Sequence, residues 1–137
     1  MTKTFTAPFA QTPRTATAIV TGAATVNNDA PVNTVALLTA GADGAIVTSL
    51  WAMPRATVTA SSLVLYLSKD NGTSQRMIDS ELMTAHTVAA TTAIPETKFA
   101  NISETTPLRL AAGDKLYVGS QVALASGIVF KAEYTDF

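Results

Sequence analysis

The sequence contains no cysteine, one histidine and few charged side chains. Without cysteine there can be no disulfide, no thiolate catalysis and no zinc site built on thiolates. Nine Lys and Arg oppose ten Asp and Glu, a formal net charge of -1. This balance lacks the basic stripe of a nucleic-acid-binding protein and the polybasic segment of a membrane-surface anchor. The composition predicts neither nucleic acid nor membrane as a partner.

Long apolar runs are also missing. No stretch reaches the roughly 18 apolar residues that a transmembrane helix needs. Residues 1–18 contain prolines and no continuous apolar stretch, so we expect no secretory signal. The length of 137 residues suits one domain, which at this size buries roughly two-thirds of its unfolded surface. Such a core needs neither disulfides nor a structural metal.

What the chain does contain is Ala and Thr, which together make up about a third of it, and one clear hairpin pattern. Leucines at 63, 65 and 67 alternate with Val64, Tyr66 and Ser68, which is the two-residue period of a strand. Asn71-Gly72 follows and is typical of a type I′ turn with positive φ at both residues. Placing the turn there predicts that Leu67 faces Arg76, Leu65 faces Ile78 and Tyr66 pairs with Met77. One face would then hold the apolar residues Leu63, Leu65, Leu67, Ile78 and Leu82.

Turn signals recur at short intervals along the rest of the chain. Asp43-Gly44 separates two apolar runs and predicts a second hairpin, while Gly113 and Gly127 mark further turns. Residues 81–92 mix helical spacing with β-branched side chains, which predicts an irregular crossover with at most one helical turn. The pattern predicts an all-β fold over residues 15–137: a single antiparallel β-sandwich, jelly-roll-like, with about eight strands.

Residues 1–14 differ from this pattern and are predicted to form an extended N-terminal arm. Two prolines oppose regular pairing, and two phenylalanines give the segment apolar anchors. The arm could fold over its own domain or dock on a neighbouring subunit, and composition does not decide between them. As a partner-binding hypothesis, the second possibility assigns the contact to Phe5, Pro8, Phe9, Pro13 and Arg14.

No arrangement of residues points to catalysis, a cofactor or a metal. His86 has no nucleophile and orienting carboxylate at a recognisable spacing, and Asp70-Asn71-Gly72 lacks the remaining ligands of a calcium loop. The acidic residues are scattered, several of them in turns. The sequence predicts a protein that is not an enzyme. A sugar-binding platform remains open as an alternative for the strand aromatics Trp51, Tyr66, Tyr117 and Tyr134.

The final third of the chain carries a family resemblance. Residues 107–119, PLRLAAGDKLYVG, follow a DNGT hairpin and resemble small β-sandwich virion structural proteins of tailed bacteriophages, of the capsid decoration or head-spike type. The resemblance implies a structural protein on the capsid surface, made in the host cytoplasm. It also implies two partners for the chain, the major capsid protein and further copies of the chain itself, with a trimer as one possible homo-oligomer. The alternative is a carbohydrate- or receptor-binding module of a tail fibre or surface protein.

Overall fold

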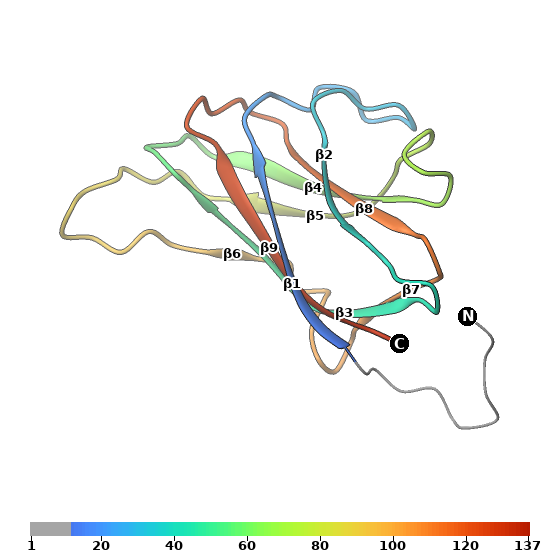
Figure 1. Cartoon of the computed structure of the whole chain (residues 1–137). Helices are drawn as coiled ribbons and strands as arrows, with labels where there is room; N and C mark the ends of the chain where they lie inside the picture. Colours follow the sequence, from blue (N-terminus) through green and yellow to red (C-terminus); the bar gives the residue numbers. More distant parts are fainter. Residues whose placement is uncertain (1–11) are drawn as a thin grey trace.

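A computed structural model describes residues 12–137, which form nine β-strands in two antiparallel sheets and no α-helix. The sheets lie face to face as two layers (Figure 1), which confirms the predicted β-sandwich. Sheet A contains Thr12–Val20 (β1), Ala45–Pro54 (β3), Thr97–Lys98 (β6), Leu108–Leu110 (β7) and Ile128–Asp136 (β9). Sheet B contains Val35–Thr39 (β2), Ser61–Ser68 (β4), Arg76–Met83 (β5) and Lys115–Ser120 (β8). The jelly-roll connectivity stays a prediction.

Sheet A has the order β1-β9-β3-β6, with β7 also paired to β3, and sheet B has the order β2-β8-β4-β5. Alternate residues of each strand point between the sheets, as the two-residue period requires. The buried core there contains Leu63 and Leu65 of β4 and Phe130 of β9, each fully buried. The ring of Phe130 lies 6.5 Å from that of Phe99, which directly follows β6. These contacts hold the two layers together.

The predicted hairpin joins β4 to β5, and both of its turn residues adopt positive φ, Asn71 at 60° and Gly72 at 91°. Leu67 faces Arg76 and Tyr66 faces Met77, as predicted. Beyond this point the register shifts by one residue, a β-bulge.

The bulge changes which side chains of β5 face the core. Leu65 pairs with Asp79 instead of Ile78, so the predicted pairing and the shared apolar face are wrong. A one-residue shift exchanges the two faces of a strand. Ile78 and Leu82 are consequently 41% and 64% exposed.

The second predicted hairpin, at Asp43-Gly44, is not formed. The turn is present, with the Gly44 N–H donating to the carbonyl of Gly41 at 3.1 Å, but it joins β2 of sheet B to β3 of sheet A. The turns at Gly113 and Gly127 also cross between the sheets. Glycine at positive φ favours a tight reversal but does not determine whether the flanking strands pair.

The connection between β1 and β2, residues 21–34, lies against the outer face of sheet B. The Ala24 N–H donates to the carbonyl of Ser120 at 2.7 Å, and the Gln75 N–H donates to the carbonyl of Asp29 at 2.8 Å. Ala24, Val64 and Tyr66 are fully buried and form a second, smaller core. This connection therefore covers sheet B on the side away from the main core.

The connection between β5 and β6, residues 84–96, projects from the body (Figure 1). It has no helical turn, and its backbone meets the body where His86 and Val58 exchange hydrogen bonds of 2.9 and 3.0 Å. Its β-branched residues do not favour a helix. Within residues 12–137 there is no helix that could span a membrane.

Candidate interaction surface

The predicted arm joins the sandwich at the beginning of β1. This strand begins at Thr12, three residues before the predicted domain boundary, and pairs with β9 along its whole length. Pro13 and Arg14 therefore belong to sheet A and not to an arm. Pro13 is tolerated because β1 is an edge strand. Phe5, Pro8 and Phe9 lie outside the described residues.

A buried carboxylate fixes this end of β1. The Arg14 Nε donates to Asp136 Oδ2 at 2.6 Å, and the Gly41 N–H donates to Asp136 Oδ1 at 3.1 Å. The Asp136 side chain is 12% exposed, whereas that of Arg14 is 53% exposed. A β-carbon at residue 41 would lie 3.1 Å from the same carboxyl group, which explains the glycine. Asp136 thus links the first strand, the last strand and the turn between β2 and β3.

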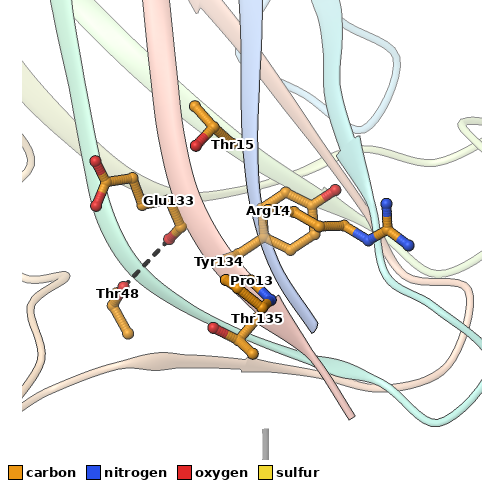
Figure 2. A pocket seen from close by; sticks show the side chains of 7 residues that line it. All are labelled: Pro13, Arg14, Thr15, Thr48, Glu133, Tyr134 and Thr135. Atoms are coloured by element: carbon orange, nitrogen blue, oxygen red, sulfur yellow. Dashed lines mark hydrogen bonds between the residues drawn. The ribbon is translucent and has the colours of Figure 1, made fainter. Parts of the chain in front are cut away.

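A hollow of about 250 Å³ lies beside this contact, on sheet A (Figure 2). A register shift leaves Thr48 of β3 without a partner on β9, and its hydroxyl donates to the carbonyl of Glu133 at 3.3 Å. Figure 2 shows Arg14 pointing away from Thr48 and Glu133. The side chains that line it on the outer face are the hydroxyl groups of three threonines and the carboxylate of Glu133, whereas the ring of Tyr134 packs against the main core. Such a lining can hydrogen-bond an extended peptide, and it pairs no nucleophile with a base.

The outer face of sheet A carries two adjacent rows of side chains set by the strand register; we call it the sheet A face. One row is apolar, with Ile19, Val129 and Met53 side by side on β1, β9 and β3. In the next row Lys131 lies over the Trp51 ring, with 5.1 Å between its Nζ and the ring centroid. Ile19 is 46% exposed and the other apolar members are half-buried. No segment of residues 12–137 covers this face as residues 21–34 cover sheet B.

A second exposed apolar surface lies on β5, the edge strand of sheet B; we call it the β5 edge. Met77, Ile78 and Leu82 are all more than 40% exposed there. The acidic residues between them face the core side, where Asp79 Oδ1 accepts from Asn101 Nδ2 and Glu81 Oε1 accepts from the Ala100 N–H. Acidic side chains turned inward on an edge strand oppose uncontrolled pairing with other sheets.

The four strand aromatics do not form a sugar-binding platform. Tyr66 is fully buried under residues 21–34, and Tyr117 packs beside it on sheet B. Trp51 lies on the sheet A face, and Tyr134 of β9 is paired with Arg14 of β1. Because the four side chains belong to different surfaces, the predicted shared site is not formed.

The other groups considered for chemistry are also dispersed. The His86 Nε2 is buried without a hydrogen-bond partner, and so is the hydroxyl of Tyr66, whose pKa is raised by burial. Residues 12–137 hold no group of three or more side chains that could bind a metal ion.

Comparisons with protein-family models, with curated proteins and with solved structures found no match. Function must therefore be argued from the sandwich and its surfaces. Sequence reasoning missed the sheet A face, although the apolar outward positions of residues 19, 53 and 129 could have indicated it once the strands were aligned. It missed the β5 edge because the bulge is not visible in the pattern.

Proposed function

We propose that this chain is a non-enzymatic virion structural protein that binds the outside of a tailed-phage capsid and stabilises it as a decoration protein. Its main partner would be the major capsid protein. The observation that carries the proposal is the fixed exit of the N-terminal segment, where the Arg14–Asp136 contact ties the first strand to the last. A rigid body whose N-terminal segment leaves from a fixed strand suits attachment to an assembled shell.

The energetics of such a protein require binding and no chemistry. A protein that binds the assembled shell and not its separated subunits stabilises the shell by mass action. The 11 residues before β1 can span at most about 40 Å when extended, enough to reach across to a neighbouring subunit. The hydroxyl-lined hollow at the beginning of β1 offers further hydrogen bonds close to the same contact.

Deleting residues 2–11 tests the attachment. The boundary follows from β1, because removing Thr12 to Arg14 as well would damage sheet A. We expect urea unfolding to stay unchanged. The affinity for purified particles, measured by co-sedimentation, should fall at least about tenfold. A matched variant, Phe5→Ser with Phe9→Ser, keeps the chain length and should lose binding to a similar extent. Undiminished binding by the deleted protein would contradict the proposed role of the arm.

Copy number tests the capsid assignment separately. Mass spectrometry of purified particles should give about one copy of this chain per shell subunit or per symmetry-related site. A few copies per particle would place it at a neck, spike or tail. Absence from particles would favour the carbohydrate- or receptor-binding module, for which Trp51 on the open sheet A face is the residue to replace.

A further inference from the structure

β1 differs from the other edge strands of the sandwich in length and regularity. It pairs with β9 through nine consecutive residue pairs without a register shift. β6 and β7, at the opposite edge of sheet A, have only two and three residues, and the edge strands of sheet B, β2 and β5, each contain a register shift. Short strands and bulges protect edges against pairing with other sheets, and β1 has neither of these protections.

Charge does not protect β1 either. β5 turns Asp79 and Glu81 toward the core side, which is a common protection of edge strands. β1 has no charged residue after Arg14, and the Arg14 side chain is bound to Asp136 of its own chain. Pro13 interrupts the edge only at the beginning of the strand. Residues 15–20 of β1 therefore form an edge that is open to a further strand.

Two backbone hydrogen bonds fix the direction of the backbone groups along β9. The Arg55 N–H donates to the carbonyl of Gly127 at 3.0 Å, and the Phe137 N–H donates to the carbonyl of Gly44 at 3.2 Å. Gly127 and Phe137 flank β9, and their partners flank β3. Because backbone groups alternate in direction along a strand, the odd-numbered residues of β9 bond β3 and the even-numbered ones bond β1.

The same alternation identifies the free backbone groups of β1. Each even-numbered residue of β9 pairs with an even-numbered residue of β1, so Thr15, Thr17 and Ile19 point their N–H and C=O groups away from β9. Within residues 12–137 these groups have no other backbone partner. Pro13 agrees with this assignment, because proline is tolerated on an edge strand where its missing N–H would face solvent.

We propose that β1 pairs with β1 of a second copy, antiparallel and centred on Thr17, so that the two sheets A join into one continuous sheet. In this register Thr17 faces Thr17 of the second copy, and Thr15 faces its Ile19. Both copies contribute the N–H and C=O groups of the same residues, which form about six hydrogen bonds around a two-fold axis. Such a contact uses the same surface on both copies and therefore closes at a dimer.

The free groups select this register over its neighbours. Centred on Thr17, the missing N–H of Pro13 falls opposite Thr21, whose carbonyl already accepts from the Leu124 N–H at 3.0 Å. A centre one residue earlier would place the Ile19 carbonyl opposite Pro13, where no donor exists. A centre one residue later would place the Thr15 N–H opposite the Thr21 carbonyl, which is already bonded. Only the middle register pairs every free group.

The sequence of the edge also suits a second copy as the partner. In an antiparallel pair, like charges placed directly opposite each other are destabilising. Residues 15–20 are Thr, Ala, Ile and Val, so no charges meet when this edge is paired with itself. The inference goes beyond attachment to a capsid and does not depend on it.

Single cysteines can map the pairing, because the chain contains none. Opposite residues of a hydrogen-bonded pair have Cα atoms about 5.5 Å apart, within reach of a disulfide. With a mild oxidant, the full-length Thr17→Cys protein should therefore form a covalent dimer. Its yield should be at least about tenfold above that of Thr87→Cys, a control at an exposed threonine in the connection between β5 and β6.

Cysteines on either side of Thr17 test the register. Thr15→Cys alone and Ile19→Cys alone should stay largely uncrosslinked, because each residue lies more than about 13 Å from its copy in the second chain. A mixture of these two variants should crosslink, since Thr15 faces Ile19 across the axis. Efficient crosslinking of Thr15→Cys by itself would contradict the proposed register.

Sedimentation velocity tests the association without crosslinking. The full-length parent protein should dimerise, with a dissociation constant in the micromolar range. Thr17→Pro removes an N–H that β9 does not use, so it should leave the fold intact and weaken the dimer at least about tenfold. Thr17→Val keeps this N–H and should dimerise like the parent protein.

Two further outcomes would overturn the inference. A parent protein that stays monomeric at about 1 mM does not use this edge to bind a second copy. If only the protein lacking residues 2–11 dimerises, the N-terminal segment of the same chain occupies the edge in the full-length protein. None of these measurements involves capsids, so failure here is distinguishable from failure of the proposed attachment.

Discussion

The outer faces of both sheets carry apolar side chains, but within residues 12–137 only the face of sheet B is covered by another segment of the chain. On sheet B, Val64 and Tyr66 are fully buried because residues 21–34 lie over them. On sheet A, Ile19 is 46% exposed and Trp51 is half-buried, with no comparable segment above them within residues 12–137. One face has become a second core, and the other remains available for contact with another molecule.

The comparison shows that an outward apolar residue on a strand can serve either purpose. Alternation assigns Tyr66 and Trp51 to the same kind of position, opposite the main core of their respective sheets. What separates them is a connection distant in sequence, anchored where Ala24 bonds Ser120. Apolar residues that the chain covers contribute to its own stability, whereas an apolar patch left open is a candidate surface for contact with another molecule.

Truncating one aromatic residue on each face should give the largest difference. Tyr66→Ala removes a fully buried ring, and we expect it to lower the free energy of unfolding by about 3–5 kcal/mol. Trp51→Ala removes a larger but half-exposed ring and should cost only about 1 kcal/mol. Urea unfolding of both variants measures the two changes. Equal losses would contradict the distinction between a covered and an open face.

A conservative control isolates packing from hydrogen bonding at Tyr66. Its hydroxyl is buried without a hydrogen-bond partner, so Tyr66→Phe should be neutral or slightly stabilising. A loss above roughly 1 kcal/mol would mean that this hydroxyl has a partner, such as a bound water.

The hairpin tip beside the covered face offers a second test. Gly72 has φ of 91°, and a side chain there would meet the hydroxyl of Tyr117, which packs against the second core. Gly72→Val should therefore lower the free energy of unfolding by about 1–3 kcal/mol through backbone strain, with a further loss from the displaced ring. The matched substitution Gly113→Val shares the positive φ but meets no atom within 4 Å, so it should cost less.

Much of the sandwich could be predicted because its local signals are strong. Asn71-Gly72 specified a turn that the structure shows at positive φ, and period-two alternation located most of the strands. Partner choice could not be predicted in the same way. The Asp43-Gly44 turn looks like a hairpin turn, yet β2 pairs with β8 and β3 with β9, because long-range burial decides which strands are neighbours.

The candidate surfaces were harder to predict than the strands. The bulge beside Leu65 has no composition signal, yet it determines that Ile78 and Leu82 are exposed. The arm was predicted to end at residue 14, but β1 already begins at Thr12. Pro13 did not exclude strand pairing, because proline on an edge strand costs no ladder hydrogen bond. Arg14 was assigned to a partner, whereas in the structure it binds Asp136 of its own chain.

The smallest expected effect comes from Asp70, also at the hairpin tip. The Ser74 N–H donates to Asp70 Oδ1 at 2.7 Å and holds the pKa of this carboxyl below its ordinary value. A lowered folded-state pKa stabilises the protein above the unfolded-state pKa, about 3.9, and this contribution disappears as pH falls through the folded value. Asp70→Asn should therefore be slightly less stable than the parent protein at neutral pH.

The difference between Asp70→Asn and the parent protein should shrink as Asp70 becomes protonated. Urea unfolding of both proteins from about pH 7 to about pH 2.5 measures it. Because the group is exposed, the whole effect should be small and should weaken with salt. A difference that keeps its neutral-pH size down to about pH 2.5 would mean that the charge of Asp70 plays no part and that only the shape of the turn matters. The tip that borders the covered face would then depend on backbone geometry, centred on Gly72, more than on electrostatics.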